Sequence, residues 1–180
     1  LIATAKAKPG QLNYASAGVG SATHVNAEKF RAQANIQLTH IPFKGTPETI
    51  VETSAGRVDF MFTPVLASIP SIRDNRMRAI AVSTAKRSST LPDVPTVREL
   101  GFPNLELEGW NGVFAPAKTP KDIIDRLNKE IIAAVKHPDV VKRLNELGAE
   151  GVGSTPAAQD AMLRKQMDQF RAIIREMKLE

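Results

Sequence analysis

The order of apolar and polar positions in the first half of the chain predicts strands and helices in alternation. Short runs of β-type residues lie at 12–16, 37–41, 58–62 and 77–83. Apolar residues at helical spacing occupy the intervening segments 22–34, 47–55 and 65–73. Because each predicted helix joins two predicted strands, the pattern indicates right-handed βαβ units and a mostly parallel sheet. We therefore predict an α/β fold.

The second half of the chain changes from alternating elements to helices. Residues 87–107 are irregular apart from a helical turn or two at 96–101. Residues 108–116 form an extended, glycine-containing segment that we interpret as a crossing strand. Amphipathic helices are then predicted to begin near Pro120, Pro138 and Pro156. Their apolar stripes are wide enough to need a partner surface.

The first predicted strand ends in a turn that contains two glycines, Gly18 and Gly20. Glycine permits backbone angles that other residues disfavour, and Ser21 can cap the helix that follows. Backbone N–H groups gathered beside the hydroxyls of Ser16 and Ser21 would suit a carboxylate or phosphate. The spacing matches neither the dinucleotide fingerprint nor the P-loop. From this stretch alone, a turn that serves only packing remains the alternative.

Later strand ends repeat the arrangement. Thr46 is a good N-cap and Pro47 a good first helical residue, and Lys44 lies at that junction. Another predicted strand ends at Thr63-Pro64 and again leads into a helix. Parallel sheets bind ligands at the carboxyl ends of their strands, here 16–21, 42–46, 62–64 and 83–86. Lys44 either neutralises a bound acid or simply lies in solvent.

Composition narrows the classes of function. The 180 residues are 42% hydrophobic and 24% charged, values typical of a soluble globular protein, and they contain no apolar run long enough to span a membrane. The formal charge of +5 is scattered, and only one Trp and one Tyr could stack on bases, which argues against nucleic acid as a partner. The absence of cysteine excludes thiolate catalysis and fits an oxidising compartment.

Histidines give no metal site, because His24, His40 and His137 share no ligand spacing. For His24 we favour packing or helix capping over ligand contact, and His40 is expected on a sheet face. A hydrolase using Ser16 and His24 is the rival reading, but there is no nucleophile-elbow motif and no acid placed to orient the imidazole. Paired carboxylates that would suit a lyase are also missing at the strand ends.

Several phrases in order resemble one family, the periplasmic solute-binding receptors of tripartite tricarboxylate transporters, known as Bug or TctC-like receptors. They begin with the stretch 5–21, AKAKPGQLNYASAGVGS, and continue with HIPFKG at 40–45 and GRVD at 56–59. They go on with MRAIAVS at 77–83, LPDVPT at 91–96 and EGWNGVFAP at 108–116. The resemblance covers essentially the whole chain.

This resemblance implies an architecture. The family has the type II fold of periplasmic binding proteins, in which two α/β lobes close on an organic acid. Residues 1–108 are then expected to form the second lobe. Residues 109–180 are expected to form the crossing strand and the carboxyl-terminal helices of the first lobe. Family members are longer at the amino end, so we expect the amino-terminal part of the first lobe, and any signal peptide, to lie outside this sequence.

The resemblance also implies a function. An extracytoplasmic receptor, not an enzyme, would bind a small mono-, di- or tricarboxylate without a cofactor in the periplasm and deliver it to membrane transporter subunits. Family ligands are held mainly by backbone N–H groups and hydroxyls at helix starts. The corresponding positions here are Ser16, Ala17, Gly18, Gly20, Ser21, Thr23, Lys44, Gly45, Thr46, Pro64 and Val65. A ligand-sensing effector domain of a transcription regulator is the alternative.

Overall fold

A parallel sheet organises the first of two units into which the chain divides, Leu1–Glu108 and Gly109–Glu176. The computed structural model describes residues 1–107, 109–147 and 149–176, so Glu108, the predicted boundary, lies outside the described residues. In the sheet, β1 (Asn13–Ser16) lies between β2 (Thr39–Pro42) and β3 (Phe60–Met61), and both pairings are parallel. The predicted α/β fold with a parallel sheet is confirmed.

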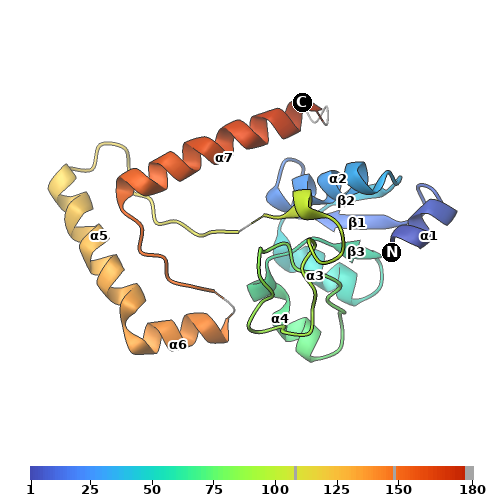
Figure 1. Ribbon diagram of the computed structural model, residues 1–180, viewed down its shortest axis with the longest axis horizontal. Helices are drawn as coiled ribbons and strands as arrows, with labels where there is room; N and C mark the ends of the chain where they lie inside the picture. Colours follow the sequence, from blue (N-terminus) through green and yellow to red (C-terminus); the bar gives the residue numbers. More distant parts are fainter. Residues whose placement is uncertain (108, 148, 177–180) are drawn as a thin grey trace. The chain divides into compact units, whose positions relative to one another are not determined.

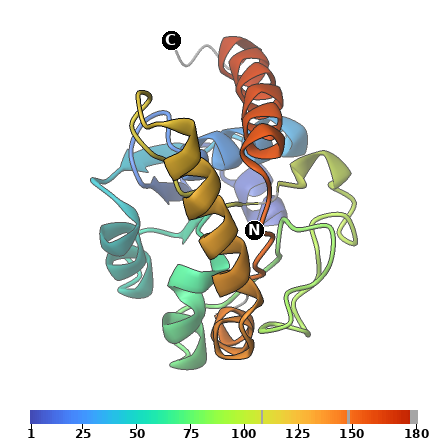
Figure 2. The same ribbon diagram turned by 90° about the vertical axis from the view of Figure 1, so that its left-hand side faces the viewer.

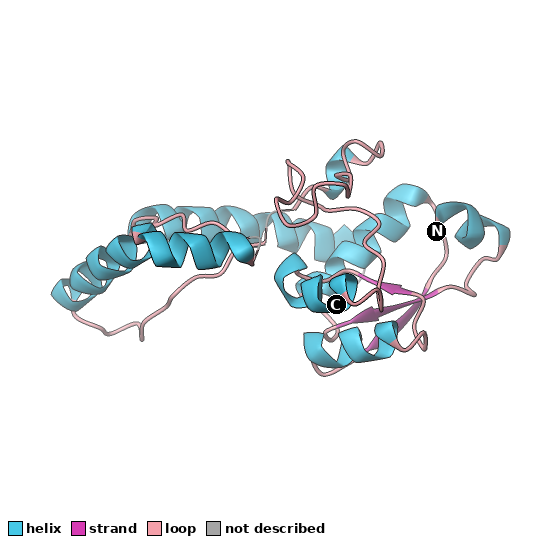
Figure 3. Ribbon diagram, turned by 90° about the horizontal axis from the view of Figure 1, so that it is seen from below, coloured by secondary structure: helices cyan, strands magenta, loops and turns pink. Residues whose placement is uncertain are grey.

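Helices lie on both sides of the sheet (Figures 1 and 3). They are α1 (Ile2–Ala7), α2 (Ala22–Ala34), α3 (Thr46–Ser54) and α4 (Val65–Arg73), of which α2 and α3 connect strands of the sheet. The oxygen of Ser21 caps α2 by accepting from the His24 backbone N–H, and Asn35 ends α2 with a left-handed φ of 49°. Pro47, in the first turn of α3, needs no N–H partner there.

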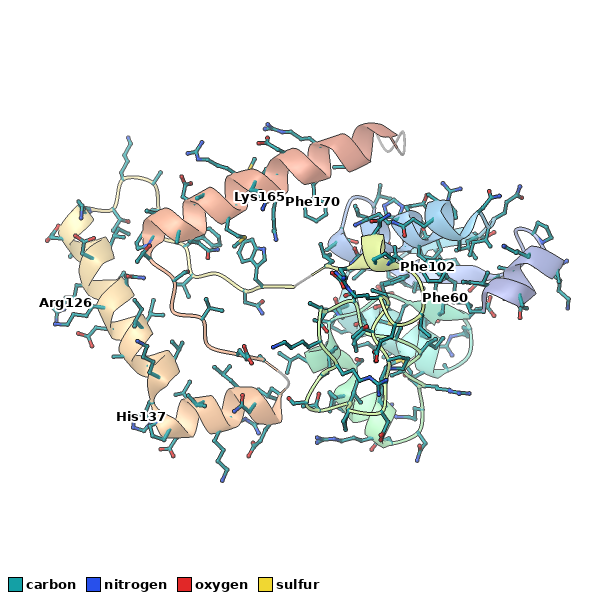
Figure 4. The ribbon with its side chains drawn as sticks, viewed as in Figure 1. Phe60, Phe102, Arg126, His137, Lys165 and Phe170 are labelled. Carbon is teal, nitrogen blue, oxygen red and sulfur yellow. The ribbon has the colours of Figure 1, made fainter. Side chains whose placement is uncertain are left out.

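Aromatic side chains fill the core between the sheet and α2. Tyr14 is completely buried, and its strand register places it beside His40 of β2 and Phe60 of β3. The ring of Phe30 meets Phe60 and Phe102 edge to face, with centroids 6.2 Å apart in both pairs. Figure 4 labels Phe60 and Phe102 in this cluster. The core thus joins β1, β3 and the irregular segment after residue 87.

The fourth predicted strand, 77–83, is wrong. Only Val82 makes a β-bridge there, with Thr96, and Ile80 is 54% exposed. The sequence has a strand-like composition, but a strand requires a neighbour along its length. Among the described residues, the segment's backbone bonds to the later chain come only from Val82, to residues 95 and 97, and from Ser83, to Leu107. The predicted helix at 96–101 forms turns, followed by the 3₁₀ helix η1 (Pro103–Leu105).

Glu99 fastens this irregular segment. Its carboxylate accepts hydrogen bonds from the Arg87 guanidinium and the Thr96 backbone N–H, and these lower its pKa to about 2. The stability from this carboxylate is therefore present above its ordinary pKa of 4.5 and is lost as pH falls toward 2.

We predict that Arg87→Gln raises the pKa of Glu99 toward 4.5, because the first cause of the shift is the bond from Arg87. An NMR titration of the Glu99 carboxyl carbon checks this, with Lys86→Gln as a control that removes a neighbouring charge. An unchanged Glu99 pKa in Arg87→Gln would show that the ion pair does not form in solution.

Helices make up most of the second unit: α5 (Lys121–Lys136), α6 (Pro138–Glu146) and α7 (Pro156–Glu176). Figure 2 shows α5 and α6 meeting at a corner, where Figure 4 labels His137. The Trp110 indole N–H donates to Gln166 of α7 at 2.6 Å. Residues 109–116 pair with no strand among the described residues, so the crossing strand is not observed. Within the described helices, none has the length and apolar character needed to cross a membrane.

Candidate functional site

The carboxyl ends of the three parallel strands place three turns at one edge of the sheet. The turns are 17–21 after β1, 43–45 after β2 and 62–64 after β3, and they lead into α2, α3 and α4. The Phe43 backbone N–H donates to the Ser16 carbonyl at 2.9 Å, which ties the first two turns together. We call this edge, with the helix starts it carries, the turn edge.

Gly18 approaches the second turn closely. Its φ of +121° lies where only glycine is comfortable, and a Cβ atom there would lie 3.4 Å from the Phe43 carbonyl oxygen. Gly20 also has a left-handed φ, +77°, but open space beside it. The two predicted turn glycines are therefore required by the backbone path, since both adopt a positive φ.

Hydroxyl groups fix the first turn from inside. The Gly18 N–H donates to Ser16 Oγ at 3.2 Å, and the Ala17 N–H donates to Thr23 Oγ1 at 2.9 Å. Ser21 Oγ donates to the Gly18 carbonyl at 2.7 Å and accepts from the His24 N–H at 3.3 Å. Ser16 itself is 0% exposed. The hydroxyls of Ser16, Ser21 and Thr23 thus shape the turn, and the first-turn N–H groups of α2 at Ala22 and Thr23 face outward from the helix start.

The second and third turns carry fewer side-chain bonds. Lys44 is exposed, and its backbone N–H donates to the Glu48 carboxylate at 3.1 Å. Gly45 is the N-cap of α3 and Thr46 its first residue, while Pro64 is the N-cap of α4 and Val65 its first residue. Apart from Ser16, which is the last residue of β1, each predicted site residue therefore lies in a turn or the first turn of a helix at the turn edge.

A stack of three rings supports the first turn. The His24 and His40 rings lie 4.1 Å apart at 14°, and His40 lies 4.8 Å from Tyr14 at 15°. His40 Nε2 lies 2.6 Å from Ser16 Oγ, and the Gly20 N–H donates to His24 Nδ1 at 3.1 Å. We call His24 and His40 the imidazole pair. Sequence reasoning placed each histidine alone and missed the pair, because the register that brings His40 beside Tyr14 is set by strand pairing and not by the local sequence.

Burial and charge set the protonation of this stack. Burial lowers the pKa of His24, and burial together with neighbouring His24 lowers the pKa of His40. Burial raises the pKa of the Glu28 carboxyl, but hydrogen bonds from Arg31 and Tyr14 lower it more. The Tyr14 hydroxyl donates to Glu28 at 2.7 Å, and burial first, then this bond, raises the Tyr14 pKa. The pair is therefore neutral near pH 7, beside a carboxylate that is already paired.

The rival serine hydrolase needs a different geometry. Ser16 contacts His40 rather than His24, and its side chain is buried away from any substrate. Among the described residues, no cluster of metal-binding side chains occurs. The observed chemistry is that of backbone donors, hydroxyls and one lysine at helix starts, which suits an anion rather than bond cleavage.

Comparison with protein-family models places residues 1–179 in the tripartite tricarboxylate transporter family receptor model. The chain belongs to this receptor family. This family is one of solute-binding receptors, so the resemblance seen in the sequence is confirmed and the hydrolase and lyase alternatives are removed. The family also favours the receptor over the transcription-regulator alternative.

Curated relatives match nearly all of the chain. A UPF0065 protein in the tcbD-tcbE intergenic region of Pseudomonas sp. strain P51 is 37% identical over 180 residues, covering 99% of this chain and 54% of that protein. Protein BugT of Bordetella pertussis is 32% identical over 176 residues, covering 98% and 54%. The chain thus spans about half the length of these curated relatives.

Solved structures extend the likeness to the fold. R. palustris Rpa4515 with adipate is 29% identical with a TM-score of 0.93, covering 98% of this chain and 59% of that one. MatC from Rhodopseudomonas palustris with bound malate is 27% identical with a TM-score of 0.88, covering 96% and 60%. The periplasmic binding protein BugD is 30% identical with a TM-score of 0.91, covering 99% and 60%. The predicted periplasmic-binding-protein fold is confirmed.

Proposed function

We propose that this receptor chain contributes one lobe of a site for a small organic acid, and that the turn edge holds a ligand carboxylate. Three helices start at that edge, and each leaves backbone N–H groups without intrahelical partners. A carboxylate at a helix start is stabilised by about 0.3–1 kcal/mol, and by up to about 2 kcal/mol when partly buried. The convergence of three helix starts on one sheet edge is the observation that carries the proposal.

Charge at the turn edge favours a dicarboxylate over a neutral solute. Lys44 is the exposed cation of the second turn, and its backbone N–H is already bonded to Glu48. Because Glu48 occupies part of the α3 start, the α2 start offers the more open donors. We assign the closest carboxylate contacts to the open N–H groups of Ala22 and Thr23 at the start of α2, because the N–H groups of Ala17, Gly18, Gly20 and Ser21 are engaged inside the turn and shape it. The flanking surface consists of Lys44, Gly45 and Thr46 of the second turn and Pro64 and Val65 of the third.

We infer that the turn edge belongs to the second lobe, predicted from the sequence at 1–108, and that residues 109–180 contribute the crossing segment and the carboxyl-terminal helices of the first lobe. The structures of relatives contain adipate in one case and malate in another, which supports a dicarboxylate as the class of ligand. In the intact receptor the loaded protein would present its ligand to transporter subunits in the periplasm, as the family name implies.

Binding of malate and adipate to the purified protein tests the proposal. We expect saturable binding by calorimetry and a raised unfolding temperature, because a ligand that binds only the folded state stabilises it. Lys44→Ala should weaken binding several-fold, since an exposed charge contact is worth up to about 1 kcal/mol. Lys8→Ala, at the opposite end of β1, is the matched control. Equal effects of malate and its uncharged dimethyl ester would refute a carboxylate site.

A further inference from the structure

The imidazole pair contacts the first turn at two points. Through Nδ1, the His24 ring accepts the N–H of Gly20, one of the two turn glycines. Through Nε2, the His40 ring meets Ser16 Oγ, which in turn accepts the N–H of Gly18. The two rings stack at 4.1 Å, and His24 is only 4% exposed. The conformation of both glycines therefore depends on the two rings.

We propose that His24 and His40 are positioning residues that hold the first turn in its anion-binding conformation only while both rings are neutral, so that acid opens the turn and weakens ligand binding. The conformational part stands on these contacts alone. The binding part rests on the proposed function of the turn edge. Neither histidine needs to touch the ligand for this role.

The His24 contact fixes the required protonation state. An imidazole nitrogen accepts a hydrogen bond only while it carries no proton, and the Gly20 N–H points at Nδ1. A proton on Nδ1 would make two N–H donors, those of His24 and Gly20, face each other in a buried position. The turn must then move so that both groups find acceptors.

The stack disfavours protonation of both rings. Two imidazolium rings with centroids 4.1 Å apart would repel each other in a site screened from water. The charged and titratable groups around the pair are Tyr14 of β1 with Glu28 and Arg31 of α2. The Glu28 carboxylate is 2.7 Å from the Tyr14 hydroxyl and 2.8 Å from Arg31, so its oxygens are already engaged. The Glu28 carboxylate therefore stabilises a newly protonated imidazole only weakly.

Burial of the two histidines also favours their neutral form. Because the pKa values of both histidines lie below the ordinary 6.5, the unfolded chain binds protons first as pH falls. The stability contributed by the neutral pair is present above about pH 6.5 and is lost as pH falls toward the lowered values. A positively charged imidazolium could instead attract an anionic ligand and strengthen binding at acid pH. The sign of the pH effect on affinity therefore distinguishes this attraction from the proposed opening of the turn.

NMR on the ligand-free protein tests the conformational part. We expect His24 and His40 to titrate below the ordinary histidine value of 6.5, and the protection factor of the Gly20 amide to fall as they titrate. In His24→Asn, whose amide oxygen can accept from Gly20 without titrating, the Gly20 signal should stay constant over this range. A Gly20 amide that is insensitive to the titration of His24 in the wild type would overturn the proposal.

Affinity for malate tests the binding part. We expect the wild-type dissociation constant to rise about tenfold between pH 7.5 and pH 5, comparable to the loss of one hydrogen bond. The ratio between the two pH values should approach one in His24→Asn and keep its wild-type value in His137→Gln. Tighter binding at acid pH in the wild type would overturn the proposal. Absence of malate and adipate binding at every pH would refute the proposed function instead, and the Gly20 result would still decide the conformational part.

Discussion

Tyr14→Ala is expected to lower the free energy of unfolding by about 3–5 kcal/mol, the usual cost of removing a large aromatic ring from a core. The Tyr14 side chain is completely buried and packs between side chains of both neighbouring strands. Its ring centroid lies 4.8 Å from that of His40 and 5.9 Å from that of Phe60. Its loss would leave a cavity in the centre of the sheet face and the Glu28 carboxylate without one of its donors. Denaturant unfolding followed by circular dichroism measures the change.

Two further variants separate the causes. Tyr14→Phe keeps the ring and removes only the bond to Glu28, so we expect a smaller loss of about 1–3 kcal/mol, the cost of leaving a buried acceptor unpaired. Val51→Ala, at a side chain 58% exposed on α3, should change stability by less than about 0.5 kcal/mol. If Tyr14→Ala proved as mild as Val51→Ala, the ring would not be part of the core in solution.

Gly18→Ala is expected to reduce carboxylate affinity by more than about tenfold. The φ of +121° costs a residue with a Cβ about 1–3 kcal/mol. The turn would relieve this strain by changing its backbone path, which takes its N–H groups out of register with the second turn. Calorimetric titration with malate measures the change.

Gly10→Ala is the matched control for this substitution. Gly10 also has a left-handed φ, +74°, but nothing lies within 4 Å of the position of an added Cβ, and it precedes β1 at the opposite end of the strand. We expect it to lose stability from the strained φ while affinity stays unchanged. Equal losses of affinity in Gly10→Ala and Gly18→Ala would mean that general destabilisation, and not the turn, governs binding.

The sequence was sufficient to predict the elements that repeat a local pattern. The β1 turn and the cap at Ser21 each depend on residues within a few positions, and each formed where predicted. The predicted N-cap of α3 is wrong by one residue, because Gly45 rather than Thr46 is the N-cap and Pro47 is the second helical residue. Residues 77–83 failed for a non-local reason, because β-type composition does not supply a neighbouring strand. The contact between Ser16 and His40 is also non-local, since it depends on the register between β1 and β2.

The resemblance to receptors led correctly to the family, whereas the assignment of individual ligand contacts stays a prediction. Ser16 illustrates the difference. As a hydroxyl beside a glycine turn it suggested a ligand contact, but in the structure it is buried and bonded to His40 and Gly18. Sequence pattern identifies which residues lie at a strand end, and only the packing decides which of them face outward.

The contiguity of the turn edge affects how this receptor can diverge. All three turns, the hydroxyls that shape them and the imidazole pair are encoded between residues 13 and 65. One recombination event that exchanges this gene segment would therefore transfer a complete edge, with its internal contacts intact. A series of single substitutions would instead produce intermediate proteins in which the side chains that support a turn no longer fit that turn. Ligand preference in such a scaffold can thus change by exchange of one segment.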